Sequence, residues 1–451
     1  MSRTTDMTAG NPVKLILTFS LPLILTNIGQ QLYMIVDASI VGLGVGVKAL
    51  AAVGATDWTY WVILWTITTM TQGFATFVSR YFGEKDYEKM NKAVANAIWL
   101  SGAVAIVLTV AGLLLARPVL VLLKTPDDIL NDSVLYLSTL VAGSLAVAGY
   151  NITAAILRAL GDGKSPLIAM VIAAVLNVGL DVIAVFVLDW GIFGTALASV
   201  CAQLIAFLYC LWQIIKTDSV HLDKNTLLPD LSMAKALFAF GLPLALQYIV
   251  INISGMVLQS TVNLQGSIFV AGYTANNKVY GLLECSAISL GFSATTYFSQ
   301  NFGAKQMERI RTGMRATIGI GIGMALVIGG LMALVGQPLL RLFIDQAEVG
   351  ASQALSVAHR YLMTMSACLI ILFLIYAYRS VLQSMGTSIP SMISGFTECA
   401  ARIFVAKGLY IWLGQQSLYF AEPIAWLGSL VFIMASYYAL RPRYIKNSKR
   451  M

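Results

Sequence analysis

Two aspartates stand in long apolar segments that carry no basic residue at comparable depth. Asp37 lies in the segment 14–40, and Asp181 lies in the segment 167–188, four residues after Asn177. A lone charge among apolar residues is costly, so each carboxylate must carry a proton or hold a cation. Because residues four apart share a helix face, Asn177 and Asp181 present an amide and a carboxylate together. These groups suit a proton's hydrogen-bond network or a hard cation that takes oxygen ligands.

A second group of ionisable residues, farther along the chain, is able to neutralise itself. Lys278, Glu284, Glu398 and Arg402 sum to zero charge. Glu398 and Arg402 are four residues apart on one helix face, so we predict that they form a structural ion pair. Glu284 has no assigned partner and remains a candidate for a second coupling site.

The sequence gives little support for an enzyme. The run GDGKS at 161–165 ends like a phosphate-binding loop, but Arg158 stands where that loop requires glycine, and Pro166 follows at once. His221 and His359 lie outside the cores of the apolar segments, so neither a buried zinc site nor a Ser/His/Asp triad can be assembled. We therefore expect no enzyme activity, no metal and no organic cofactor, with H⁺ or Na⁺ as the only coupled ion.

The elements that position these residues are predicted to cross a membrane. Hydrophobic residues make up 58% of the 451 residues, charged residues 11%, and the mean hydropathy is +0.79. Such a chain lacks the charge that a water-facing surface of its size needs. Apolar runs of about 20 residues, the length of a membrane span, predict an all-α integral membrane protein with twelve transmembrane helices, at 14–40, 49–77, 93–116, 133–156, 167–188, 192–215, 236–262, 268–298, 316–336, 355–382, 389–412 and 418–440.

The basic residues are sorted to one side of these spans. Most of the 29 Lys and Arg fall in the termini and in alternate connections, and we count Arg379 with them. This bias predicts that both termini are cytoplasmic, in a multi-pass protein of the cytoplasmic (inner) membrane. Because the basic residues are spread over several segments, the net charge of +8 reflects topology, and no nucleic-acid partner is expected.

The chain also repeats itself after about half its length. FSLPL at 19–23 returns as FGLPL at 240–244, SRYFGEK at 79–85 as SQNFGAK at 299–305, and LRALGDGKSP at 157–166 as LQSMGTSIP at 382–390. Internal repeats of this size are typical of transporters. They predict two pseudo-symmetric six-helix lobes, 1–215 and 236–451, joined by a cytoplasmic connector, 216–235.

The repeat assigns the acidic site to the first lobe. A shift of 221 residues, the separation of Pro22 and Pro243, tests whether the second lobe keeps the polar stripe of the first helix. It sends Thr26, Gln30, Tyr33 and Asp37 onto Gln247, Ile251, Ser254 and Leu258, so most of the stripe is lost. Asn177 and Asp181 fall on Ala401 and Val405 at a shift of about 224.

These features resemble the multidrug and toxic compound extrusion (MATE) family over nearly the whole chain. The resemblance is carried by VDASIVG (36–42), the Asn177/Asp181 pair, GDGKSP (161–166), SQNFGAK (299–305) and GFTECAAR (395–402). It implies that Asp37 is an essential carboxylate, that Asn177 and Asp181 join it, and that the hydroxyl of Ser199 completes the cluster. NorM-like members carry an acidic residue near Ile251, which is absent here, so the chain is closer to the DinF-like branch.

Several residues are candidates for lining a substrate cavity. Aromatic faces attract cations, and methionine side chains adapt to varied shapes. The candidates are Gln30, Tyr33, Met34, Trp61 and Met256.

The expected function is a cation-coupled multidrug efflux antiporter that works by alternating access. Its partners would be small lipophilic cations and membrane lipids, and we expect a monomer. One alternative is a flippase for a lipid-linked precursor, which would need a cationic cavity. A second is a membrane scaffold without transport, which the repeat disfavours. Whether protons or sodium ions drive transport stays open.

Overall fold

The computed structural model describes residues 4–221, 223, 226–344 and 350–448, and every regular element in this part of the chain is a helix. Within it the helices group into twelve rods. The first six are α1 (Pro12–Gly44), α2 (Val47–Glu84), α3 (Tyr87–Leu122), the pair α4 (Asp127–Ala142) and α5 (Ser144–Ala159), α6 (Lys164–Val182) with its continuation η1 (Ile183–Val187), and α7 (Gly191–Ile215). The other six are α8 (Leu231–Asn263), α9 (Ser267–Gly303), α10 (Met307–Arg341), the pair α11 (Ala351–Ala367) and α12 (Leu369–Ser384), α13 (Ile389–Ile403) with η2 (Phe404–Leu409), α14 (Tyr410–Leu413) and η3 (Gly414–Phe420), and α15 (Ala421–Ser448).

Most of the rods have the lengths and compositions of membrane spans. Of the described helices, seven are long and apolar enough to cross a membrane by themselves, or up to nine if each bent pair is one span. One of the seven, Ile389–Pro442, contains both α13 and most of α15. The prediction of an all-α membrane protein with twelve transmembrane helices in two six-helix lobes is confirmed.

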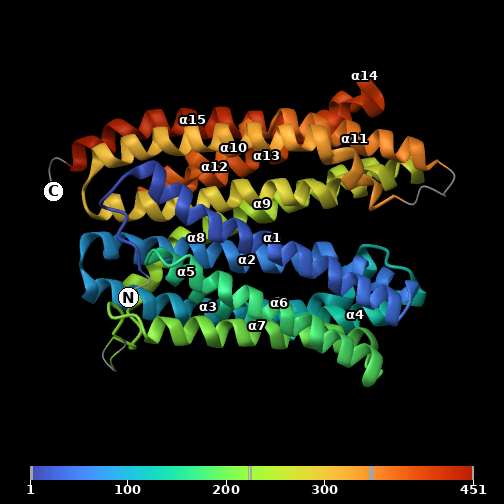
Figure 1. Ribbon diagram of the computed structural model, residues 1–451, viewed down its shortest axis with the longest axis horizontal. Helices are drawn as coiled ribbons and strands as arrows, with labels where there is room; N and C mark the ends of the chain where they lie inside the picture. Colours follow the sequence, from blue (N-terminus) through green and yellow to red (C-terminus); the bar gives the residue numbers. More distant parts are fainter. Residues whose placement is uncertain (1–3, 222, 224–225, 345–349, 449–451) are drawn as a thin grey trace. The chain divides into compact units, whose positions relative to one another are not determined.

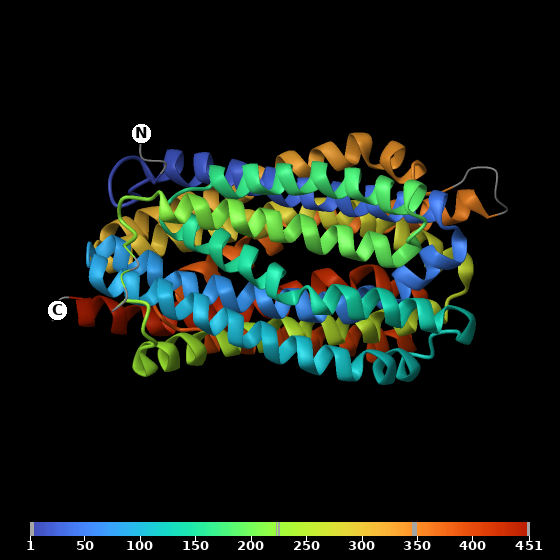
Figure 2. The ribbon, with the colours of Figure 1, turned by 90° about the horizontal axis from the view of Figure 1, so that it is seen from below.

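The chain divides into two compact units. Unit 1 contains residues Met1–Met7 and Leu25–Ala245, and unit 2 contains Thr8–Ile24 and Leu246–Met451. In each unit the helices run side by side along most of their length (Figure 1), and the view turned by 90° agrees (Figure 2). The lobe boundaries expected from the sequence remain a prediction, since the units are defined by packing alone.

Two helices, α1 and α8, each belong to both units. The change of unit falls after Ile24 in α1 and after Ala245 in α8, in each case two residues beyond a proline, Pro22 or Pro243. Proline removes one backbone hydrogen bond and locally weakens a helix. The repeated proline therefore marks the point at which each helix passes from one unit to the other.

Close packing holds the first part of α8 in unit 1. A Cβ atom on Gly241 would lie 2.6 Å from the Phe74 ring, and one on Gly73 would lie 3.3 Å from the Gly241 Cα atom. These glycines let α2 and α8 approach closely, as small residues do between membrane helices.

Hydrogen bonds hold the first part of α1 in unit 2. The Ser293 hydroxyl donates to the Ile16 carbonyl at 2.9 Å, and Arg309 Nη1 donates to the Gly10 carbonyl at 2.9 Å. The repeated motifs FSLPL and FGLPL therefore have equivalent positions in the architecture.

Departures from straight α-helix occur at similar places in both units. The pairs α4/α5 and α11/α12 bend by 44° and 47°. The π-helical segments η1 and η2 begin two residues after Asp181 and Arg402, respectively. Because π-helical turns are frequent at functional sites, the surroundings of Asp181 and Arg402 are candidates for such sites.

Candidate functional site

The four residues predicted to couple an ion all belong to unit 1. Asp37 lies on α1, Asn177 and Asp181 lie on α6, and Ser199 lies on α7. Asp181 is fully buried, Asn177 is 1% exposed and Asp37 is 8% exposed. Polar groups with so little exposure must find partners inside the protein.

The carboxyl groups of Asp37 and Asp181 face each other within hydrogen-bonding reach. Among the described residues, no N–H or O–H donor reaches Oδ1 of Asp37 or either carboxyl oxygen of Asp181. Two carboxylates at this separation cannot both remain charged without a proton or a cation between them. This pair of facing acceptors is the most distinctive chemical feature of unit 1.

Asn177 and Ser199 connect α6 to α7 beside the acidic pair. The Asn177 amide donates through Nδ2 to the Ser199 hydroxyl at 3.2 Å. Its Oδ1 atom is buried and has no donor in the described part of the chain. The amide is thus held by its nitrogen, and its oxygen is left as an additional acceptor, a suitable ligand for a hard cation.

Other polar residues surround the acidic pair, among them Asp57 on α2, which lies in the electrostatic field of Asp37. The Tyr33 hydroxyl is a hydrogen-bond partner of Gln203 and lies in the field of both aspartates. Tyr136 lies in the field of Asp37 and is 6% exposed. Gln203 could have been predicted from the sequence, because it follows Ser199 by four residues and shares its helix face. Tyr136 on α4 could not, because only the packing of the helices places it near the aspartates.

Acceptor groups of these kinds suit the reversible binding of a proton or a monovalent cation. Within the described residues, no group of three or more His, Cys, Asp or Glu side chains could hold a metal ion. Carboxylate, amide and hydroxyl oxygens converge on one region.

The candidate cavity residues are only partly brought together. Tyr33 joins the acidic cluster, whereas Trp61 stacks on Trp65 with ring centroids 6.4 Å apart. Gln30 and Met34 on α1 are half-buried. Met256 is half-buried in unit 2, and its role remains a prediction.

Unit 2 contains a buried network of charged side chains. Glu398 forms ion pairs with Arg402 at 3.2 Å and with Arg379 at 3.0 Å, and Arg402 also pairs with Glu422 at 2.6 Å. Arg402 also donates to the Ser254 hydroxyl and, at 3.1 Å, to the Ile251 carbonyl. The two arginines and two glutamates balance in charge.

This network corrects two sequence-based interpretations. Arg379, counted with the cytoplasmic residues, is 5% exposed inside α12, and its guanidinium bonds to Ser394 and Ser429 as well as to Glu398. Lys278, expected to balance the second lobe, is exposed. Arg379 is buried because it pairs with Glu398, and a guanidinium that has an ionic partner tolerates burial.

Glu284 on α9 lies in the electrostatic field of this network, close to Glu422, Glu398 and Arg402. No salt bridge in the described part of the chain includes it. Because the four-residue network is already balanced, Glu284 adds a carboxylate without a counter-charge of its own. It therefore resembles the unit 1 aspartates in its electrostatic situation.

Comparisons with known proteins agree on one family. The family model described as MatE matches residues 22–183 and 243–406. The Bacillus subtilis protein described as "Probable multidrug resistance protein YpnP" is 28% identical over 414 residues, 92% of each chain. The Staphylococcus aureus protein named "Multidrug export protein MepA" is 23% identical over 437 residues, 95% of this chain and 94% of that protein.

Solved structures show the same fold. A MOP superfamily transporter from Pyrococcus furiosus superposes with a TM-score of 0.90 at 21% identity, covering 99% of this chain and 100% of that one. A MATE protein crystallised in a bent conformation gives a TM-score of 0.87 at 21% identity, covering 99% of both chains. The sequence-based resemblance is thereby confirmed at the level of family and fold.

Proposed function

Because the chain belongs to the MatE family, we propose that it is an antiporter that exports amphipathic, often cationic compounds in exchange for a coupling cation, with protons preferred to sodium. The names of its relatives, multidrug resistance and multidrug export proteins, support the substrate class. The observation that carries the coupling is the buried pair Asp37 and Asp181, whose carboxyl groups face each other, while no donor among the described residues reaches Oδ1 of Asp37 or either carboxyl oxygen of Asp181. We further propose that the protein works as a monomer in the cytoplasmic membrane with both termini cytoplasmic.

The proposed cycle depends on the change of charge at the Asp37/Asp181 site. When the aspartates lose their proton, the site is anionic and favours a cationic substrate. When a proton enters from the side of higher proton concentration, the site becomes less negative and releases the substrate. The driving force is adequate, since one charge that crosses about 100 mV contributes about 2.3 kcal/mol.

Proton coupling predicts that drug affinity rises with pH. A cationic fluorescent drug binds to the purified protein, and its Kd is measured from about pH 5 to about pH 8, with and without sodium. Protons compete with the drug cation for the carboxylates, so the affinity for the drug should be weakest at the acidic end of the pH range. The addition of sodium at each pH should change the affinity little.

The same titration contains the result that would overturn proton coupling. An affinity that is independent of pH and responds only to sodium would assign the site to that ion. In that case Asn177→Ala should weaken the sodium response specifically, because it removes a neutral oxygen ligand from the cluster. Ser199→Ala is the matched comparison, since it removes the hydroxyl that accepts from Asn177 Nδ2.

Glu284 is the proposed second coupling residue, in unit 2. Glu284→Gln should reduce export driven by an imposed gradient several-fold, because an amide preserves the shape but cannot exchange a proton. Glu88→Gln, on an exposed acid of α3, is the control and should have little effect. Unchanged transport in Glu284→Gln would assign coupling to unit 1 alone.

The flippase alternative receives less support from the charged groups. A carrier of a pyrophosphate headgroup needs uncompensated positive charge in its cavity. The buried arginines Arg379 and Arg402 are balanced by Glu398 and Glu422. Export of cationic compounds is the better match for Asp37 and Asp181, which form no salt bridge in the described part of the chain.

A further inference from the structure

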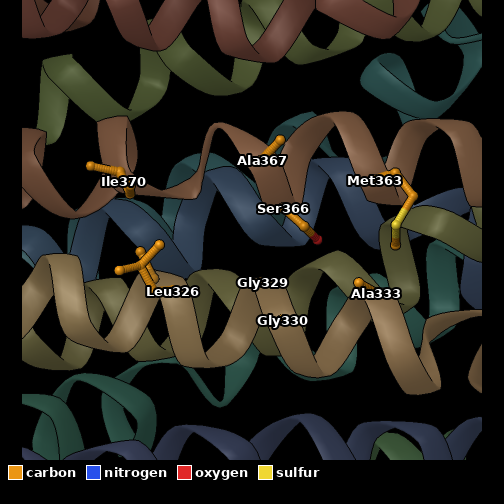
Figure 3. Close-up of a pocket in the computed structure, with 9 residues that line it drawn as sticks. Leu326, Gly329, Gly330, Ala333, Met363, Ser366, Ala367 and Ile370 are labelled. Atoms are coloured by element: carbon orange, nitrogen blue, oxygen red, sulfur yellow. The ribbon is translucent and has the colours of Figure 1, made fainter.

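A cavity of about 270 Å³ lies in unit 2 between α10 and the bent pair α11/α12. Figure 3 shows it at the bend, bounded by α10 on one side and by the end of α11 on the other. Its lining is almost entirely apolar: Ala325, Leu326, Gly329, Gly330, Ala333, Met363, Ser366, Ala367 and Ile370. Leu326 and Gly330 are exposed, so the cavity opens to the surface of the unit. An apolar cavity of this kind does not hold water stably.

The corresponding positions in unit 1 carry larger side chains. The repeat SRYFGEK/SQNFGAK, with a separation of 220 residues, relates Gly329, Gly330 and Ala333 to Thr109, Val110 and Leu113. The Thr109 hydroxyl donates to the carbonyl of Val141, two residues before the bend at Gly143. In unit 2 a Cβ atom on Gly329 would lie 3.1 Å from the carbonyl of Ser366, which is two residues before the bend at Cys368. The second repeat therefore has small residues at three positions where the first repeat has larger side chains.

One polar group faces the cavity. Ser366 is 8% exposed, and its hydroxyl has no hydrogen-bond partner among the described residues. Figure 3 shows its oxygen directed toward the space between α11 and α10. An unpaired buried hydroxyl is unfavourable, so it indicates that the natural occupant brings an acceptor to this point.

A cation lies on the same helix face, nearer one membrane surface. Arg360, Met363 and Ala367 are spaced by three and four residues, which places them in one row along α11. Arg360 is exposed and lies 5.0 Å from the centroid of the Tyr419 ring, and it forms no salt bridge in the described part of the chain. The Tyr419 side chain is also a hydrogen-bond partner of Arg360, and most of the five N–H donors of the guanidinium stay available. Arg360 stands six residues from Ser366, about 9 Å along the helix axis.

We propose that this cavity is a binding site for one phospholipid, with its phosphate on Arg360, an ester carbonyl accepting from Ser366 and an acyl chain in the groove beside Gly329 and Gly330. The ester groups of a phospholipid lie a few bonds below its phosphate, which matches the order of Arg360 and Ser366 along α11. A helix from a second copy is the rival occupant, because Ala325, Gly329 and Ala333 form a small-residue row. A helix is about 10 Å across, however, and this hollow lies between two packed helices, which suits a single hydrocarbon chain.

The test uses the full-length protein in mild detergent and native mass spectrometry with added palmitoyl-oleoyl phosphatidylglycerol. Gly330→Leu fills the groove and should lower the fraction that carries one lipid at least fivefold. Gly323→Leu is the matched control, two turns away on the same face of α10. A Cβ atom meets nothing within 4 Å at either glycine, so both variants should fold. Ser366→Ala should weaken lipid binding about fivefold, the loss expected for one neutral hydrogen bond.

Two further experiments distinguish the contribution of the lipid headgroup from that of the acyl chain, and a bound lipid from a second copy of the protein. A diacylglycerol with the same acyl chains lacks the phosphate, and Arg360→Gln should remove most of the preference for phosphatidylglycerol over it. Equal lipid loss in Gly330→Leu and Gly323→Leu would overturn the site. So would a dimer that Gly330→Leu abolishes while lipid binding stays unchanged, since the groove would then be a helix interface. Neither result depends on export, so the proposal can fail while the antiport proposal stands.

Discussion

Asp37→Asn is expected to abolish gradient-driven export while the protein still folds and inserts. The amide has the shape of the carboxyl group, but it cannot exchange a proton or carry a charge at the buried site beside Asp181. Transport should fall to the level measured without a gradient. The measurement is substrate uptake into everted vesicles under separately imposed proton and sodium gradients, with the amount of inserted protein determined in the same vesicles.

A control with the same chemical change separates charge at the site from charge in general. Asp128 is an exposed acid of the same unit, 3.5 Å from Lys48, with its side chain 56% exposed. Asp128→Asn should export at nearly the normal rate. If Asp37→Asn retained gradient-driven transport, the assignment of Asp37 to coupling would be wrong.

Glu398→Ala and Arg402→Ala are each expected to destabilise the protein strongly. Removal of one partner leaves a buried charge without compensation, which typically costs about 3–5 kcal/mol. Glu398→Ala leaves Arg379 without its ionic partner and Arg402 with Glu422 alone. Arg402→Ala leaves Glu422 without its ionic partner and Glu398 with Arg379 alone. The double variant keeps Arg379 and Glu422, which still balance, so its loss should be smaller than the sum of the two single losses.

The midpoint of thermal unfolding in detergent, measured for all four members of the cycle, tests this coupling. Glu308 and Arg311 supply the control pair, since they are 4.0 Å apart with side chains 79% and 51% exposed. Alanine at either control position should cost less than about 1 kcal/mol, as is usual for surface pairs. Additive losses at Glu398 and Arg402 would mean that their pairing contributes nothing to stability.

Local chemistry in the sequence was sufficient to predict the helices and the candidate residues. Span length follows from bilayer thickness, and uninterrupted apolar runs of that length have few alternatives to a helix. Buried carboxylates such as Asp37 and Asp181 are rare enough in such runs to stand out singly. The repeated prolines, Pro22 and Pro243, indicated two related halves because they recur within matching motifs.

What the sequence left open depends on contacts between residues far apart in the chain. The family resemblance implied that Asp181 joins Asp37, but whether Gln203 and Tyr136 join them is decided by how α1, α4, α6 and α7 pack. The burial of Arg379 was missed for the same reason, since its partners Glu398 and Ser429 lie 19 and 50 residues away. Helix periodicity states which residues share a face, but it does not state which face another helix will cover. Only the packed structure determines that, because the free energy of a buried charge depends on the partner that packing supplies.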